Sequence, residues 1–112
     1  MSRRVCFALD LVADADLIAE YERAHAAGAV WPEVVEGIRA KGFLEMEIWR
    51  AAERLFMIAT VTDDWPRDIG ASQRAVDGTW EAAMNKFHRP LPCATAGEKW
   101  VPMSRIYALD DQ

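Results

Sequence analysis

The segment from Leu55 to Val61 is apolar at nearly every position, and this limits the folds that the chain can adopt. Successive side chains of a β-strand point to opposite faces of the sheet, so both faces of this segment carry apolar groups. An antiparallel sheet with one face in water shows a clean alternation of apolar and polar residues instead. The sequence therefore predicts a strand over residues 55–61 whose two faces are both covered.

Hydrophobic periodicity divides the rest of the chain into further strands and helices. We predict strands over residues 5–11, 43–49 and 101–109, and helices over about 14–27, 32–42 and 66–87. Asp14 and Asp16 are candidate N-caps of the first helix, and Pro32 suits the first turn of the second. Strict alternation assigns Phe43 to the face of its strand opposite to Met46.

This order of elements predicts an α+β fold in which residues 1–112 form one domain, a ferredoxin-like antiparallel sheet with helices on one face. The simplest cover for the second face is the same sheet of another copy, related by a two-fold axis. We therefore predict a homodimer that forms a dimeric α/β barrel. The alternative is that the open face forms a ligand cavity within a monomer.

Composition excludes several classes of partner. The net charge is −5 and no basic stripe is present, so a nucleic-acid partner is not expected. Cys6 and Cys93 are too far apart in sequence for a recognisable disulfide framework or metal motif. The apolar run 5–9 ends at Asp10 and is too short for a signal peptide, and no segment approaches the roughly 20 apolar residues of a membrane span. We expect a soluble cytoplasmic protein with no membrane partner.

The chain has two histidines in different surroundings. His88 stands beside Arg89 and Pro90 at a predicted helix end, which is typical of a surface or capping residue. His25 follows Tyr21 by one turn on the apolar stripe of the first helix, so both side chains should point toward the sheet. An inward histidine is compatible with acid–base catalysis or with a hydrogen-bonded place in the core.

Tryptophan is frequent, with five copies in 112 residues. Trp31 and Trp80 fall at positions that face inward or cap a cavity, although core packing competes strongly for Trp80. Flat apolar rings beside polar groups suit a sugar, which has apolar C–H faces and a polar rim. Asp10 lies within an apolar strand and points away from Leu9, and a carboxylate buried there would need a partner.

No phosphate loop, zinc pattern, nucleophile elbow or dinucleotide fingerprint occurs in the sequence. If the chain is an enzyme, acid–base chemistry without a cofactor or metal is what remains.

Several motifs together resemble the L-rhamnose mutarotase family. Tyr21 and His25, followed shortly by Trp31-Pro32-Glu33, form the most specific of them. The spacing Val76-x3-Trp80-x3-Met84 is similar to the third helix of that family, and the strand segments extend the resemblance over most of the chain.

The resemblance implies a dimeric α/β barrel of ferredoxin-like protomers that interconverts the α and β anomers of a 6-deoxy-L-hexose. His25 matches the catalytic histidine, Tyr21 a tyrosine that contacts the substrate, and Trp80 the first of a tryptophan pair that lines the site. Met46 replaces a tyrosine of the family pattern, and Glu81 replaces the second tryptophan. Two extra residues also lie between the histidine and the Trp-Pro-Glu motif. These departures alter the pocket walls, so both L-rhamnose and L-fucose stay open as substrates.

On this reading His25 donates a proton to the ring oxygen while the hemiacetal opens and recloses. Tyr21 orients the sugar or the histidine, and Asp10 pairs with a sugar hydroxyl. Trp80 stacks on the apolar face of the sugar and Trp31 closes the pocket, with Met46 in its wall. Two other functions fit the same fold: a cofactor-free oxygenase and a non-catalytic sugar-binding domain.

Overall fold

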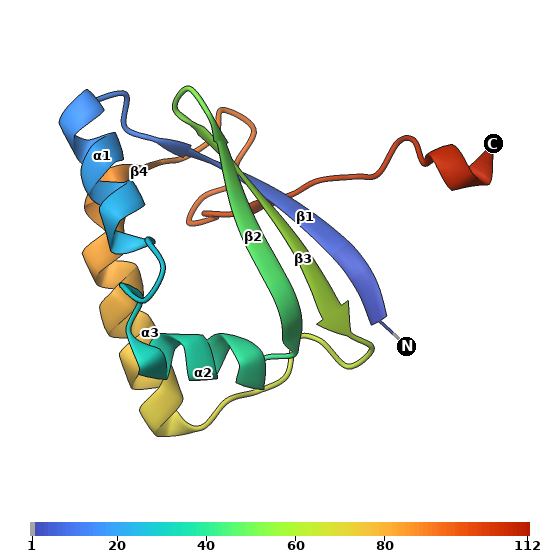
Figure 1. Ribbon diagram of the computed structural model, residues 1–112, viewed down its shortest axis with the longest axis horizontal. Coiled ribbons are helices and arrows are strands. Elements are labelled where there is room, and N and C mark those ends of the chain that lie inside the picture. The colour runs from blue at the N-terminus through green and yellow to red at the C-terminus, as the bar shows by residue number, and fades with distance from the viewer. Residues whose placement is uncertain (1) are drawn as a thin grey trace.

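The computed structural model of the chain describes residues 2–112. The strands are β1 (Ser2–Leu11), β2 (Phe43–Ala51), β3 (Arg54–Thr62), β4 (His88–Arg89) and β5 (Val101–Pro102), and the helices are α1 (Ala15–Ala24), α2 (Pro32–Ala40) and α3 (Ala71–Met84), with single 3-10 turns at Asn85–Phe87 and Leu109–Asp111. The strands pair in the order β2-β3-β1-β4, β5 also pairs with β1, and all pairs are antiparallel. Figure 1 shows the three helices on one face of this sheet. The predicted α+β architecture is confirmed.

Local chemistry accounts for the helix starts. The carboxylate of Asp14 accepts hydrogen bonds from the backbone N–H groups of Asp16 and Leu17, both at 3.0 Å, and so caps α1. Pro32 is the first residue of α2, where its missing N–H removes no helical hydrogen bond. Gly42 links α2 to β2 at a φ of 107°, and a Cβ there would lie 2.5 Å from the hydroxyl oxygen of Thr62. Only glycine fits this turn without strain.

A β-bulge near the start of β2 changes which side chains face the helices. Phe43 pairs with Val61, but Glu45 pairs with Thr60, so Leu44 is an extra residue in the ladder. Phe43 therefore lies on the same face as Met46, and the prediction from strict alternation is wrong for this residue.

Two predicted elements are shorter than expected. The helix predicted over 66–87 begins at Ala71, because Arg67 donates its backbone N–H to the carbonyl of Lys41 at 2.9 Å instead of entering a helical turn. The strand predicted over 101–109 ends at Pro102. The N–H of Met103 still bonds to the carbonyl of Cys6 at 2.9 Å, but the chain then leaves the body as an extended tail (Figure 1).

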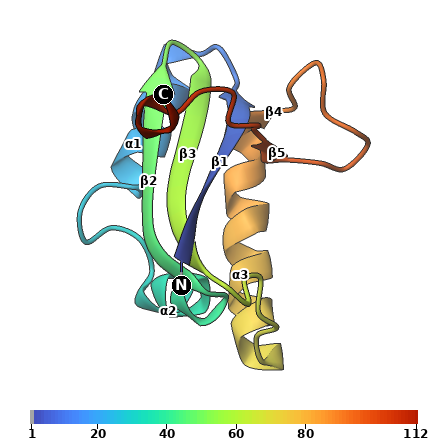
Figure 2. The ribbon, with the colours of Figure 1, turned by 90° about the vertical axis from the view of Figure 1, so that its right-hand side faces the viewer.

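The two faces of the sheet differ in their cover. The helix-covered face of β3 carries four buried residues, Leu55, Met57, Ala59 and Val61. On the opposite face Ile58 is 36% exposed, and Trp49, which pairs with Phe56 from β2, is 60% exposed. Figure 2 looks onto this open face, with the tail crossing in front of it. Within residues 2–112 no helix has the length and apolar character needed to cross a membrane.

Candidate active site

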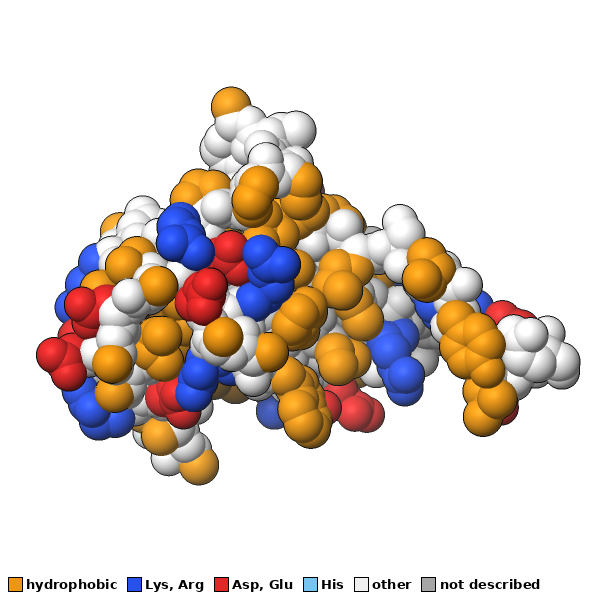
Figure 3. All heavy atoms as spheres, turned by 90° about the horizontal axis from the view of Figure 1, so that it is seen from above, with side chains coloured by type: hydrophobic (Ala, Val, Ile, Leu, Met, Phe, Trp, Pro, Cys, Tyr) orange, Lys and Arg blue, Asp and Glu red, His pale blue; other side chains and the backbone are white. Residues whose placement is uncertain are grey.

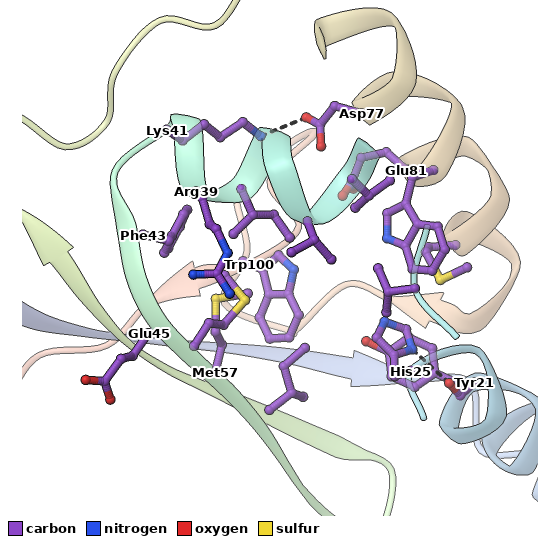
Figure 4. Close-up of a pocket in the computed structure, with 18 of the residues that line it drawn as sticks. Tyr21, His25, Arg39, Lys41, Phe43, Glu45, Met57, Asp77, Glu81 and Trp100 are labelled. Carbon is purple, nitrogen blue, oxygen red and sulfur yellow. Dashed lines mark hydrogen bonds and ion pairs between the residues drawn. The ribbon is translucent and has the colours of Figure 1, made fainter. Parts of the chain in front are cut away.

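A cavity of about 460 Å³ lies between the helices and the sheet face that they cover (Figure 4). Its volume is in the usual range for small-molecule sites. Apolar side chains form much of its wall: Val30, Val34, Val35, Ile38, Met46, Ile48, Met57, Trp80, Met84 and Trp100. In Figure 4 the side chains of Tyr21 and His25 lie together at one side of the cavity, and Glu81 enters from α3.

His25 stands at the C-terminal end of α1, one turn after Tyr21. Its Nδ1 atom lies 2.8 Å from the backbone carbonyl oxygen of Tyr21. A carbonyl oxygen only accepts hydrogen bonds, so Nδ1 carries a hydrogen and donates it. The other nitrogen, Nε2, is then the atom that can give or take a proton at the cavity. Helix geometry thus fixes the tautomer and the direction of the imidazole.

The phenol of Tyr21 is a protonated hydrogen-bonding group. Tyr21 is buried, and its ring centroid lies 4.1 Å from that of His25. Burial raises the pKa of Tyr21 well above its ordinary value, and the negative charge of Glu81 raises it further. The phenol therefore stays neutral at physiological pH and can donate to an oxygen atom in the cavity.

The two predicted tryptophans have different places. Trp80 is buried in the cavity wall, with its ring centroid 5.6 Å from that of His25. Trp31 is 38% exposed and does not line the cavity, but it packs edge-on against Trp80 at 5.0 Å. It supports the wall from outside. Met46 lines the cavity from β2.

Asp10, predicted from the sequence to contact the ligand, does not line this cavity. Its carboxylate is buried but accepts two hydrogen bonds from the guanidinium of Arg54, at 2.8 and 3.2 Å. Arg89 approaches the same carboxylate at 3.9 Å. Alternation along β1 places Asp10 on the sheet face opposite to the helices, where this ion pair explains its burial.

His88 was predicted at the surface, and this prediction is wrong. It forms β4 beside β1, lines the cavity, and has its ring centroid 5.8 Å from that of Tyr21. Burial lowers its pKa to about 4, and the charge of Lys99 contributes to the same shift. Two further residues missed from the sequence are Trp100, in the cavity wall, and Lys99, whose ammonium lies 2.7 Å from a carboxylate oxygen of Glu81.

The polar side chains around the cavity include groups that suit proton transfer and hydrogen bonding. Among residues 2–112 there is no group of three or more His, Cys, Asp or Glu side chains that could hold a metal ion. A protonated phenol, two imidazoles and an apolar aromatic wall can bind a neutral polyhydroxy compound and move a proton on it.

Comparison with known proteins decides the family. The sequence profile of the L-rhamnose mutarotases matches residues 4–109. The chain belongs to the L-rhamnose mutarotase family. An L-fucose mutarotase of Xanthomonas campestris is 44% identical over 112 residues, which covers 97% of this chain and 90% of that protein. A UPF0734 protein of Dictyostelium discoideum is 35% identical over 111 residues, covering 92% of this chain and 86% of its own length.

A solved structure shares the fold of this family member. The crystal structure of an L-rhamnose mutarotase from Formosa agariphila superposes with a TM-score of 0.67 and covers 96% of this chain and 98% of its own. The sequence identity is 18%, so the similarity concerns the fold.

Two of the three departures from the mutarotase pattern that the sequence indicates, those at Met46 and Glu81, lie at the cavity. Met46 and Glu81 each contribute to its wall, on opposite elements β2 and α3. Glu81 is held by Lys99 through the ion pair and through a 3.4 Å hydrogen bond from the same ammonium to its backbone carbonyl. A carboxylate that is ion-paired with Lys99 therefore stands in this part of the cavity wall, where the resemblance described above leads us to expect an aromatic ring.

The low pKa of His88 predicts how stability depends on pH. Between pH 6.5 and about 4 the unfolded chain binds a proton at this residue and the folded chain does not. The free energy of unfolding should therefore fall as the pH is lowered through this window. Asp64, whose pKa the Arg67 guanidinium lowers to about 2, adds to this decline only toward pH 4, where its carboxyl group begins to bind a proton in the unfolded chain. In the His88→Gln variant the free energy of unfolding should fall less steeply with decreasing pH than in the wild type. Urea titrations at pH 7, 5.5 and 4.5 measure this difference. An equal fall in both proteins would contradict the assignment of the pH dependence to His88.

Proposed function

We propose that this protein is a mutarotase that interconverts the α and β anomers of a 6-deoxy-L-hexose, with L-fucose as the favoured substrate. The observation that carries the proposal is the pair of Tyr21 and His25, with a fixed tautomer, at the wall of an apolar cavity in a member of this family. The 44% identity to a protein named L-fucose mutarotase favours L-fucose over L-rhamnose.

In the proposed mechanism His25, as imidazolium, donates the proton on Nε2 to the ring oxygen of the sugar. The C1–O5 bond breaks, the anomeric hydroxyl gives its proton to water, and C1 becomes an aldehyde. Rotation about the C1–C2 bond and the reverse proton transfers close the ring on the other face. Tyr21 donates a hydrogen bond to a sugar oxygen, and Trp80 covers the apolar C–H face.

Saturation-transfer NMR on equilibrated L-fucose and L-rhamnose tests this function. One anomeric proton is irradiated, and loss of signal at the other anomer reports exchange. We expect enzyme-dependent transfer, faster for L-fucose. Binding of either sugar without any transfer would indicate a sugar-binding domain instead, and no transfer and no binding with both sugars would overturn the proposal.

A homodimer is the second part of the proposal, and its interface is the open face of the sheet together with the tail 103–112. Figure 3 shows hydrophobic side chains gathered on the sheet and along the tail. The exposed ones include Trp49, Ile58, Met103, Ile106, Tyr107 and Leu109. Apolar surface of this extent is typical of an interaction site, and a two-fold axis would cover two identical surfaces at once.

We also place the protein in the cytoplasm. Cys6 and Cys93 are both free, and Cys93 is exposed. A free exposed thiol is stable in a reducing compartment. Fractionation of cells that express the native chain checks this, and recovery outside the cytoplasm would contradict it.

The ion pair of Asp10 separates a structural role from a catalytic one. Asp10→Ala should lower the free energy of unfolding by about 1.5–3 kcal/mol, because a buried carboxylate with two charge-assisted hydrogen bonds is lost. The folded variant should keep its kcat/KM for anomer exchange. Glu20→Ala, which removes an exposed ion pair with Lys86, is the control and should cost about 0–1 kcal/mol. If Asp10→Ala greatly lowered kcat but left the free energy of unfolding unchanged, Asp10 would have a catalytic role instead of a structural one.

A further inference from the structure

Glu81 brings a carboxylate to a cavity wall that is largely apolar. Four residues of α3 line the cavity, and their spacing places them on one side of the helix: Asp77, Trp80, Glu81 and Met84. Figure 4 shows the side chain of Glu81 entering from this helix. The side chain is 44% exposed, so a ligand in the cavity has access to the carboxylate.

Lys99 holds this carboxylate in one position. Its ammonium lies 2.7 Å from Oε2 of Glu81 and donates a second hydrogen bond, at 3.4 Å, to the backbone carbonyl of the same residue. Lys99 does not line the cavity, although the next residue, Trp100, does. The lysine therefore fixes the direction of the carboxylate without occupying the space for a ligand, and a fixed acceptor loses little conformational entropy when a ligand binds.

The fixed carboxylate still has acceptor capacity. An ionised carboxylate only accepts hydrogen bonds, and its two oxygens offer about four lone-pair directions. Within residues 2–112 the side-chain hydrogen bond of Glu81 goes to Oε2, which leaves Oε1 without a donor. Because the ammonium of Lys99 balances the negative charge, the pair suits a neutral O–H donor better than a charged ligand.

The carboxylate lies at the catalytic end of the cavity. The negative charge of Glu81 raises the pKa of Tyr21 and acts on His88, and such effects are screened beyond about 10 Å. Trp80, the neighbour of Glu81 in sequence, has its ring centroid 5.6 Å from that of His25. The acceptor therefore belongs to the same part of the cavity as the phenol and the imidazole of the proposed mechanism.

We propose that Glu81 is a sugar-binding residue whose carboxylate accepts a hydrogen bond from the C2, C3 or C4 hydroxyl of the 6-deoxy-L-hexose, and that Lys99 is its positioning residue. This role rests on the proposed mutarotase function. The anomeric hydroxyl changes its configuration in the reaction, so a fixed acceptor for it would favour one anomer. The other three hydroxyls keep their configuration. A contact with one of them stabilises the substrate and the transition state equally, so it sets KM and leaves kcat unchanged.

Two substitutions at Glu81 test the contact by saturation-transfer NMR with L-fucose. Glu81→Leu removes the acceptor and keeps a side chain of similar size, whereas Glu81→Gln keeps one acceptor oxygen without the charge. We expect Glu81→Leu to raise KM by about 10- to 100-fold with kcat within about twofold of the wild type, and Glu81→Gln to raise KM less.

Glu20→Gln is the matched control. The side chain of Glu20 is also 44% exposed and forms an ion pair at 2.9 Å, with Lys86, but Glu20 does not line the cavity. This substitution should leave KM and kcat unchanged.

Deoxy sugars separate a hydrogen bond from an effect on the shape of the cavity. KM is measured for 2-deoxy-, 3-deoxy- and 4-deoxy-L-fucose. For the sugar that lacks the bound hydroxyl, Glu81→Leu should leave KM unchanged, whereas for the other two it should raise KM as it does for L-fucose. Lys99→Met should also raise KM for L-fucose, and it should add nothing when Glu81→Leu is already present, because the lysine acts through the carboxylate.

Several results would overturn this role alone. They are exchange by the wild type together with an unchanged KM in Glu81→Leu, a fall in kcat without a rise in KM, or an equal rise in KM for L-fucose and all three deoxy sugars. If Glu81→Leu fails to fold, Glu81→Gln carries the same comparisons. No exchange by the wild type with any sugar would instead overturn the mutarotase function, and this role with it.

Discussion

Replacing His25 by alanine is expected to slow anomer exchange by about 10²–10⁴-fold, the usual contribution of a positioned general acid. The loss should lie mainly in kcat, because the proton is transferred in the transition state, while Tyr21 and Trp80 still bind the sugar. Saturation-transfer NMR at several sugar concentrations separates kcat from KM. Added imidazole should restore part of the rate by entering the space that the side chain leaves.

Arg23 provides a matched control for this experiment. It lies on the same helix, is exposed, and does not line the cavity. Arg23→Ala should keep the full exchange rate. A His25→Ala protein that unfolds at the wild-type temperature and still exchanges anomers at the wild-type rate would remove His25 from the mechanism.

Replacing Ile58 by lysine is expected to convert the proposed homodimer into monomers. Ile58 lies in the middle of the open face and pairs across the sheet with Glu47 and Cys6. A lysine there can pair with Glu47 in a free protomer, so the fold should persist. In the dimer the charge would be buried, and the two-fold axis places it in the interface twice, which should weaken association by about 10³-fold or more. Sedimentation velocity over a range of protein concentrations measures the change.

Ala83→Lys is the control for the dimer experiment, because it adds the same charge at an exposed position of α3, on the helix side of the sheet. It should leave the association constant unchanged. If the wild-type chain itself sediments as a monomer at micromolar concentration, the open face has another cover and the homodimer proposal is wrong.

The fold could be predicted because its strongest signals are local. Alternation and helical periodicity depend on neighbours within one element, and capping by Asp14 depends on residues two and three positions later. The inward direction of Tyr21 and His25 follows in the same way from a spacing of one helical turn. Phe43 was assigned to the wrong face of the sheet because the bulge adds one residue to the strand, and no local sequence pattern predicts this bulge.

The candidate site was predicted only where a single element determines it. His88 looked like a surface residue because charged and helix-breaking neighbours surround it in sequence, yet pairing of β4 with β1 brings it to the cavity. Asp10 looked like a ligand group because its partner, Arg54, is 44 residues away in sequence. Both differences arise from contacts between segments that are distant in sequence, and hydrophobic periodicity carries no information about such contacts.

The bulge in β2 has a consequence for how this protein tolerates changes in length. Downstream of it, successive residues alternate between the cavity, reached by Met46 and Ile48, and the proposed interface, reached by Glu47 and Trp49. Loss or gain of one residue there would exchange the two sets, so that tryptophan entered the sugar site and methionine the interface. Leu44 is the exception, because it is already surplus to the ladder. Natural insertions and deletions in β2 should therefore be confined to the position of Leu44. In relatives that lack this residue, the side chains downstream should still face the cavity and the proposed interface as they do here.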